Sequence, residues 1–207
     1  MNSYSTYALA DLLDAFASNE PVPGGGSAAA LTGALGVSLL IMVAGLPKTR
    51  TGAPEETADL SQASARLRPM RESLEQLIDR DAAAYHSVVA AYRLPKLSND
   101  EQAHRAQAIA DAMRAATETP LDTMRLCQQA LEAAAIVAVN GLGNASSDVA
   151  VAIELLLTAA KGAAMNVDAN LPAMKDRARA EQMRLERKEL EAESIAAAQR
   201  ARKSLLT

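Results

Sequence analysis

The chain has 207 residues, of which 49% are hydrophobic, so one domain with a buried core is expected. Its net charge of −4, from 21 basic and 25 acidic side chains, and an aromatic content of 2% argue against nucleic acid as a partner. The single cysteine, Cys127, excludes an intrachain disulfide, and its apolar neighbours predict an inert buried thiol in a reducing cytoplasm.

Helical patterns account for the chain, and alternating strand patterns of useful length are missing. From Ala53 to Asn140 there is no glycine, and the prolines in this span are placed to start helices or to flank their ends. We predict helices at residues 5–18, 27–46, 55–92, 98–117, 120–139, 147–163 and 172–206, with a short helical piece around 163–170. The predicted fold class is all-α, as a single-domain helical bundle over residues 1–207.

The first two predicted helices raise the questions of targeting and of a membrane. The N-terminal segment has no positively charged start and carries Asp11 and Asp14, so no secretory signal is expected. No charged side chain occurs from Pro21 to Pro47, and about 20 apolar residues suffice to cross a bilayer. The run is rich in Ala, Gly and Ser and lacks interfacial Trp, which favours a buried central helix over a membrane span.

The segment PVPGGGSAAALTGALG opens this central helix. Gly24, Gly25 and Gly26 allow the backbone to approach a ligand closely, and Ser27 is a natural N-cap. The positive end of the helix would then face a carboxylate, a carbonyl oxygen or another electron-rich group. A turn followed by a cap accounts for the same residues, so the pattern leaves both interpretations open.

An acidic residue interrupts an apolar face of the next helix. The face is formed by residues spaced 4, 3, 4, 3 and 4 apart: Leu74, Ile78, Asp81, Tyr85, Val88 and Tyr92. Asp79 is turned away and is expected to point to solvent. Loss of hydration among these neighbours would raise the pKa of Asp81, as in a general acid or base. The alternative is a structural ion pair with Arg or Lys of a facing helix.

The C-terminal part of the chain carries more local signals. Ser98, followed three residues later by Glu101, forms a capping box that predicts a helix start. From residue 172 onward opposite charges alternate at helical spacing, which is typical of a solvated helix. We expect a modest apolar stripe of Met174, Ala178 and Leu185 to pack this charged helix against the body.

Four segments together resemble the formiminotransferase-cyclodeaminase C-terminal domain family, whose bacterial stand-alone relatives include methenyltetrahydrofolate cyclohydrolases. The segments are PVPGGGSAAALTGALG, DRDAAAYHSVVAAYRLPK, SSDVAVA and KGAAMNVDANL, in unbroken order between Leu12 and Leu171. The resemblance implies an α-helical homodimer that acts on a one-carbon-substituted tetrahydrofolate, with no metal or redox cofactor. It makes the triple-glycine turn a substrate-side loop. In LPKTRTG, Pro47 and Thr49 depart from the family pattern.

The resemblance also implies roles for individual residues. Asp81 falls where the family has its helical acid and is the expected general acid/base. Asn166 and Asn170 share one helical face from which their amides would read a pterin ring, although Asn170 also sits where it can end its helix. Asp148 is expected either to bind substrate or to complement a helix dipole.

Three cations are candidates for the glutamate tail of a folate: Lys96, Arg105 and Arg50. His86 and His104 lie on separate predicted helices without acidic or thiol partners, so no metal site is expected. Two reactions fit, namely hydrolysis of 5,10-methenyltetrahydrofolate to the 10-formyl compound and cyclisation of 5-formiminotetrahydrofolate with loss of ammonia. The alternative is a non-catalytic helical dimer that binds a folate or another small molecule.

Overall fold

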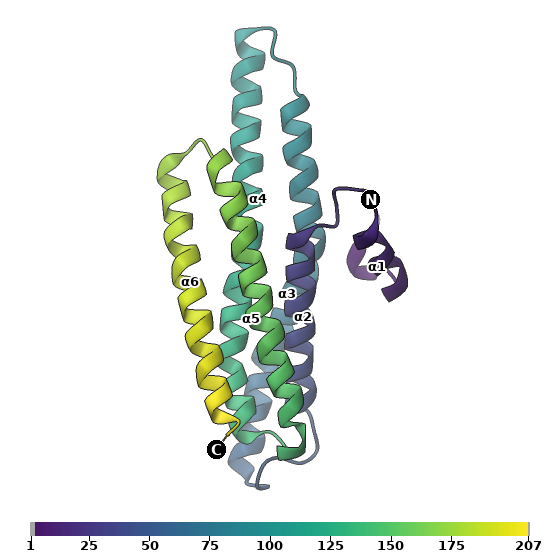
Figure 1. The fold of residues 1–207 in the computed structure, drawn as a ribbon, viewed down its shortest axis with the longest axis vertical. Coiled ribbons are helices and arrows are strands. Elements are labelled where there is room, and N and C mark those ends of the chain that lie inside the picture. The colour runs from purple at the N-terminus through teal and green to yellow at the C-terminus, as the bar shows by residue number, and fades with distance from the viewer. Residues whose placement is uncertain (1–2, 207) are drawn as a thin grey trace.

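The structure is a computed structural model that describes residues 3–206, and this part of the chain contains α-helices and short 3₁₀ turns but no β-strand. The all-α prediction is therefore confirmed. The helices are α1 (Leu9–Ala17), α2 (Gly25–Ala44), α3 (Pro54–Arg93), α4 (Asn99–Asn140), α5 (Ser146–Asn170) and α6 (Arg177–Ser204). Figure 1 shows an elongated bundle in which the α3–α4 hairpin rises above the ends of the other helices, while α1 lies beside the body.

Helix α4 is continuous, so the prediction of separate helices at 98–117 and 120–139 is wrong. Its start agrees with the capping box, because Ser98 Oγ accepts from Glu101 N at 3.2 Å and Glu101 Oε2 accepts from Ser98 N at 3.0 Å. Pro120 lies inside the helix and cannot donate to the carbonyl of Ala116, four residues earlier. The side chain of Asn170 takes over, since its Nδ2 donates to Ala116 O at 2.8 Å. The helix therefore continues through the proline.

Helix α2 packs against α3, α4 and α5 but is not covered on every side. Glycines bring it close to its neighbours, because a Cβ at Gly36 would lie 2.9 Å from Leu156 Cγ and 3.1 Å from Ala152 O. Its outward face leaves Leu35 53% exposed. Within residues 3–206, α2 is the one helix long and apolar enough to span a membrane, and half of its apolar window is buried in the bundle. The predicted buried central helix is thus central but only partly buried.

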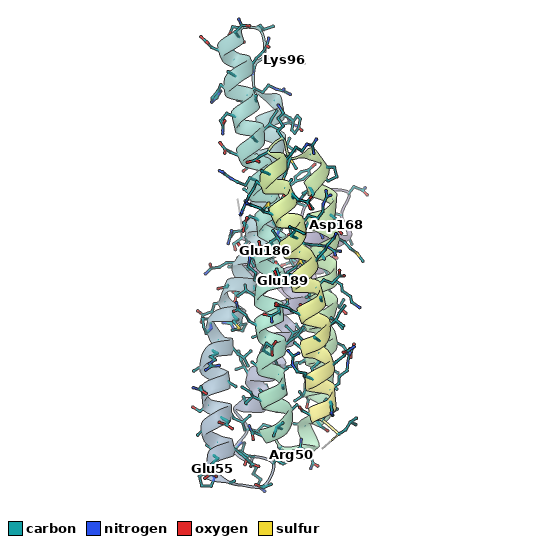
Figure 2. All side chains as sticks on the ribbon, turned by 90° about the vertical axis from the view of Figure 1, so that its left-hand side faces the viewer. Arg50, Glu55, Lys96, Asp168, Glu186 and Glu189 are labelled. Carbon is teal, nitrogen blue, oxygen red and sulfur yellow. The ribbon has the colours of Figure 1, made fainter. Side chains whose placement is uncertain are left out.

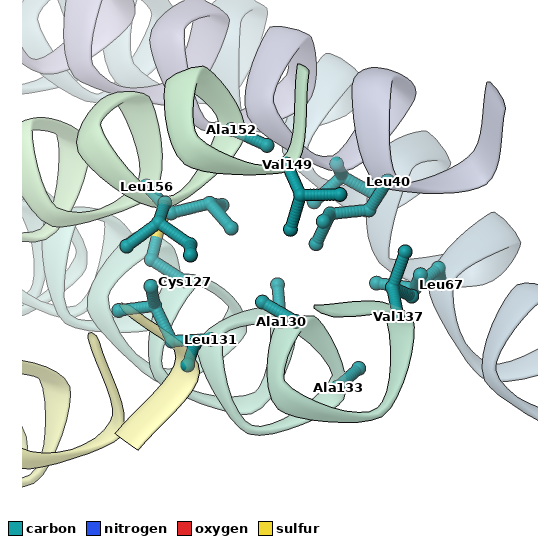
Figure 3. Close-up of a cluster of buried hydrophobic side chains, with 14 of the residues drawn as sticks. Leu40, Leu67, Cys127, Ala130, Leu131, Ala133, Val137, Val149, Ala152 and Leu156 are labelled. Carbon is teal, nitrogen blue, oxygen red and sulfur yellow. The ribbon is translucent and has the colours of Figure 1, made fainter. Parts of the chain in front are cut away.

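The main core lies between α2, α3, α4 and α5, and α6 contributes three buried alanines to it. Figure 3 shows part of this cluster, which includes Leu40, Leu67, Leu131, Val137 and Leu156. Burial raises the pKa of the Cys127 thiol to about 12, and its side chain is fully enclosed. The expectation of a buried cysteine is confirmed, and the raised pKa is consistent with a thiol of low reactivity.

The two ends of the chain depart from prediction. Helix α6 begins at Arg177 rather than at residue 172, because Leu171–Ala173 form a 3₁₀ turn. Met174 is buried before the helix starts, whereas Ala178 and Leu185 are exposed, so the predicted stripe was in the wrong register. The buried positions of α6 are Ala180, Met183, Leu190, Ser194, Ala197, Ala198 and Ala201. Small and apolar residues at this spacing form the contact with α4 and α5.

Asp79 does not point freely to solvent, which corrects the prediction for it. Its carboxylate accepts from Tyr4 N at 2.6 Å, from Ser5 Oγ at 2.9 Å and from Ser3 Oγ. These bonds attach the 3₁₀ turn Tyr4–Thr6 to α3. The first α-helix begins at Leu9, and not at residue 5 as predicted.

Candidate active site

The N-terminus of α2 meets α3 at Asp81. Ser27 N donates to Asp81 Oδ2 at 2.8 Å, and Ser27 Oγ lies 3.0 Å from the same oxygen. Because α2 begins at Gly25, its N-cap residue is Gly24. The prediction of Ser27 as the N-cap is therefore wrong. A carboxylate from α3 therefore accepts from one of the first-turn N–H groups of α2, where the helix dipole favours negative charge.

Gly26 is the residue that makes this contact possible. A Cβ built on Gly26 would lie 2.6 Å from Asp81 Cγ and even closer to Asp81 Oδ1. No side chain fits there without displacing the carboxylate. The middle glycine is less constrained, since a Cβ on Gly25 would lie 3.4 Å from Asn166 Nδ2. Of the glycines in this run, Gly26 is therefore the one that sterics require.

The environment of Asp81 tunes its proton affinity. Burial raises the pKa of Asp81 above its usual range, while the hydrogen bonds from the hydroxyl and the backbone of Ser27 oppose that rise. Ser27 is completely buried, and its Oγ also lies 2.9 Å from Ile78 O. A hydroxyl has one proton, so it donates either to Asp81 or to Ile78 O. Asp81 Oδ1 accepts no hydrogen bond from residues 3–206 and is the oxygen available to a ligand.

A pocket of about 340 Å³ opens in front of this carboxylate. It is lined by Pro21, Val22, Gly24, Gly25, Gly26, Asp81, Ala84, Tyr85, Val88, Met113, Ala116, Asn166 and Asn170. Four separate stretches of the chain, from α3, α4, α5 and the turn before α2, supply these residues. Six of the predicted site residues therefore meet at one pocket, and a seventh, Ser27, contacts it through its hydrogen bonds to Asp81.

The two asparagines face this pocket with amides that are already held by the backbone. Asn166 Nδ2 donates to Gly162 O at 2.9 Å, and Asn170 Nδ2 donates to Ala116 O at 2.8 Å. Their side-chain oxygens accept no hydrogen bond within the described part of the chain. Asn170 therefore does have a structural role, as the alternative interpretation held, and it lines the pocket at the same time.

The remaining predicted site residues lie elsewhere in the chain. Figure 2 shows Arg50 near one end of the bundle and Lys96 at the tip of the α3–α4 hairpin, at the opposite end. Arg50 Nη2 donates to Ala138 O at 2.6 Å, and Arg50 N donates to Asn140 O at 2.9 Å. Asp148 stands in the first turn of α5 and does not line the pocket. The fold does not bring these three residues to Asp81.

The aromatic face of α3 is less buried than predicted, and α4 lines the pocket although no sequence motif indicated it. Leu74 and Ile78 are buried as predicted, but Tyr85 is 41% and Tyr92 49% exposed. Met113 and Ala116 line the pocket without belonging to any motif. In the described residues, no group of three or more His, Cys, Asp or Glu side chains is placed to hold a metal ion.

Comparisons with known proteins agree with this architecture. Residues 8–189 match the family model described as formiminotransferase-cyclodeaminase. A methenyltetrahydrofolate cyclohydrolase from Methylorubrum extorquens is 39% identical over 170 residues, which cover 82% of each chain. The formimidoyltransferase-cyclodeaminase of Mus musculus is 32% identical over 74% of this chain, although the match covers only 28% of the mouse protein.

A solved structure has the same fold. The crystal structure of formiminotetrahydrofolate cyclodeaminase from Thermotoga maritima superposes with a TM-score of 0.86. The superposition covers 97% of this chain and 96% of that one, at 25% sequence identity. The helical bundle seen here is therefore shared almost end to end.

Proposed function

This chain belongs to the formiminotransferase-cyclodeaminase family, and on that premise we propose that it hydrolyses 5,10-methenyltetrahydrofolate to 10-formyltetrahydrofolate. The observation that carries the proposal is the 39% identity to a methenyltetrahydrofolate cyclohydrolase, over 82% of both chains. The pocket in front of Asp81 supports it, because a buried carboxylate with one unoccupied oxygen suits proton transfer.

In the proposed mechanism, Asp81 first acts as a general base. Ionised Asp81 attracts the cationic amidinium of the substrate, whose bridging carbon lies between N5 and N10. Its Oδ1 takes a proton from a water molecule as the water oxygen bonds to that carbon. The result is a tetrahedral adduct and a neutral Asp81, a state that the raised pKa of Asp81 favours.

Asp81 then acts as a general acid. It returns the proton to N5 while the bond between N5 and the bridging carbon breaks. The hydroxyl of the adduct becomes the formyl carbonyl on N10 and releases its proton to solvent, so one proton leaves per turnover. The single hydroxyl of Ser27 serves both states, turning toward Asp81 Oδ2 when the acid is ionised and toward Ile78 O when it is neutral.

The walls of the pocket have proposed roles in holding the ring system. The side-chain oxygens of Asn166 and Asn170 are suited to accept from the N–H groups of a reduced pterin, since both amide nitrogens are already bonded to the backbone. Gly24 and Gly25 leave space for the ring to lie against the turn before α2. Neither role requires a metal or a redox cofactor, and the proposal includes none.

A second candidate reaction is favoured by the names of other relatives. The Thermotoga maritima structure is that of a formiminotetrahydrofolate cyclodeaminase, and the mouse relative carries the same activity in its name. In that reaction N10 attacks the formimino carbon, and ammonia leaves after protonation. Asp81 would again move the proton, so the pocket serves both reactions and the substrate decides between them.

We further propose that the enzyme works in the cytoplasm as a homodimer with a folate as its small-molecule partner, and without nucleic acid or a membrane. The resemblance supports the dimer, the acidic net charge argues against nucleic acid, and the enclosed thiol of Cys127 suits a reducing compartment. Light scattering after gel filtration in detergent-free buffer tests this assembly. A monomer at micromolar concentration would contradict the dimer.

The decisive experiment gives the purified enzyme each substrate in turn. Loss of the near-ultraviolet absorbance of methenyltetrahydrofolate reports hydrolysis, and ammonia release from 5-formiminotetrahydrofolate reports cyclisation. We expect hydrolysis above the spontaneous rate, before and after treatment with a chelator. Tight binding of both folates without turnover of either would instead establish the non-catalytic alternative.

A further inference from the structure

Two helix faces continue upward from the pocket along the α3–α4 hairpin. On α3 the face runs through Asp81, Tyr85, Val88 and Tyr92, and on α4 it runs through Ala116, Met113, Ile109 and Arg105. Both sets are spaced by three or four residues, so each forms one face of its helix. Tyr85, Val88, Met113 and Ala116 already line the pocket, and Val88 packs near Ile109 and Met113. We call these residues, from Asp81 to Arg105, the hairpin face, within which Ile109 and Met113 are buried and Tyr85 and Tyr92 are exposed.

Arg105 ends the hairpin face with an oriented positive charge. Its Nη2 donates to Tyr92 O at 3.1 Å, and its guanidinium carbon lies 5.6 Å from the centre of the Tyr92 ring. Its Nε is buried without a hydrogen-bond partner. No acidic side chain in the described part of the chain forms an ion pair with it. Arg105 is therefore held in place while its charge remains uncompensated.

We propose that the hairpin face binds the p-aminobenzoyl-glutamate part of the substrate, with Tyr85 and Val88 against the aromatic ring and Arg105 on a glutamate carboxylate. This inference rests on the proposed folate activity. The polarity of the surface matches the ligand, because an anionic residue stands at the pocket end and a cationic one at the far end. Methenyltetrahydrofolate has its positive charge at the one-carbon bridge and its negative charges on the glutamate.

The dimensions also agree. Asp81 and Tyr92 are eleven residues apart on α3, which corresponds to about 16 Å along a helix. A benzoyl ring, an amide and an extended glutamate span about 10 to 12 Å by ordinary bond lengths. The remainder is bridged by the side chains of Asp81 and Arg105 at the two ends. A carboxylate placed near Tyr92 can thus reach Arg105 while the one-carbon bridge lies at Asp81.

The other arginines near the pocket are poorer candidates. A groove of about 570 Å³ between α3, α4 and α6 contains Arg114 and Arg179, but both are already neutralised. Arg114 pairs with Asp111 at 2.9 Å, and Arg179 pairs with Glu118 at 3.0 Å. Arg105, in contrast, offers a charge that no protein carboxylate occupies. Of the three cations expected from the sequence to meet the glutamate, this one lies on the hairpin face, whereas Arg50 and Lys96 lie at opposite ends of the bundle.

Steady-state kinetics with two substrates test the inference. Methenyltetrahydrofolate carries the glutamate, whereas methenyltetrahydropteroate lacks it and ends in a benzoate carboxylate at the position of the amide. For the wild type we expect KM to be about 10-fold higher for the pteroate, since a charge-assisted hydrogen bond is lost. Arg105→Ala should raise KM for the folate about 10-fold, leave kcat within about twofold, and leave both constants for the pteroate unchanged. Arg105→Lys should recover part of the loss.

Arg114→Ala is the matched control, because it removes an arginine from the other face of the same helix. It should leave both KM values as in the wild type. An equal rise of KM for both substrates in Arg105→Ala, or a glutamate-dependent rise in Arg114→Ala, overturns the assignment to Arg105. If the wild type turns over both substrates with equal KM values, the proposed role of the hairpin face is overturned while the proposed function stands. Absence of turnover with either substrate overturns the proposed function and this inference with it.

Discussion

The two ends of α2 meet charged side chains in opposite ways. Before its first turn, the carboxylate of Asp81 is held by Ser27 through one oxygen and leaves the other open to a pocket. Beyond its last turn, Arg50 donates to two backbone carbonyls, and Glu56 accepts from Thr49 Oγ1 at 2.5 Å and from Thr51 N at 2.9 Å. The carboxylate at the first turn of α2 thus keeps one oxygen open to a pocket, whereas the charged side chains beyond its last turn bind the end of α4 and the loop that follows α2.

The largest loss of activity is expected from neutralising Asp81, whose Oδ1 is open to the pocket. Asp81→Asn keeps the size of the side chain and its contact with Ser27 but removes the proton acceptor. We expect kcat for methenyltetrahydrofolate to fall by about 10²- to 10⁴-fold, the usual contribution of one positioned proton-transfer group. Initial rates together with circular dichroism spectra check that the loss is chemical.

Asp79→Asn is the matched control for that substitution. Asp79 lies two residues away on the same helix, and its carboxylate binds only the N-terminal turn. It should affect stability and leave kcat within a few-fold of the wild type. Similar losses of kcat in both variants would contradict the assignment of Asp81 to the chemistry.

The next effect comes from adding one carbon to the turn. Gly26→Ala places a methyl group against the Asp81 carboxylate and must displace it, whereas Gly25→Ala adds the same atom at 3.4 Å from the Asn166 amide. We expect kcat/KM to fall by about 100-fold for Gly26→Ala, as a misplaced catalytic group commonly costs. The loss for Gly25→Ala should be much smaller, and comparable losses in the two variants would argue against the steric explanation.

A smaller change is expected in the pH profile. Burial raises the pKa of Asp81, and the ionised form is the base, so kcat/KM should decline as the pH falls through that raised value. Ser27→Ala removes a hydrogen bond that lowers the pKa of Asp81, and the acidic limb should therefore move to higher pH. Profiles of wild type and variant, measured over the same buffers, show the shift. A limb that stays in place would mean that another group titrates.

The smallest effect is expected at the opposite end of α2. Hydrogen bonds from Thr49 and Thr51 lower the pKa of Glu56 to about 2 from its usual 4.5. A lowered pKa means that the ionised carboxylate stabilises the fold above pH 4.5 and that this contribution is lost as the pH falls toward 2. Glu56→Gln should lower the melting temperature slightly at pH 7 and leave it unchanged near pH 2, with kcat as in the wild type.

Much of the fold follows from periodicity, and the exceptions have identifiable causes. The long helices and the capping box at Ser98 were predictable, because they depend on neighbours within one or two turns. The continuity of α4 through Pro120 was not, since the amide that compensates for the missing N–H belongs to Asn170, on another helix. Asp79 was likewise misjudged because its partners, Tyr4 and Ser5, are distant in sequence.

In the candidate site, too, the features that depend on local sequence were predictable, and those that depend on tertiary contacts were not. Asp81 could be singled out because an acid on an apolar helix face is a local anomaly, and the glycine run before α2 marked the place where it docks. The α4 side of the pocket could not, since Met113 and Ala116 are ordinary helix residues whose position depends on how the hairpin pairs. The location of Arg50 also required the fold, because its partners Ala138 and Asn140 come from the far end of α4.

The proline inside α4 has a consequence for what the pocket can recognise. Because Pro120 has no N–H to donate to the carbonyl of Ala116, the nitrogen of the Asn170 amide donates to that carbonyl, and its oxygen is free to accept from a group in the pocket. The proline in α4 thereby fixes the orientation of the Asn170 side-chain amide, which belongs to α5. The Asn170 oxygen thus favours a ring that presents an N–H at this wall of the pocket.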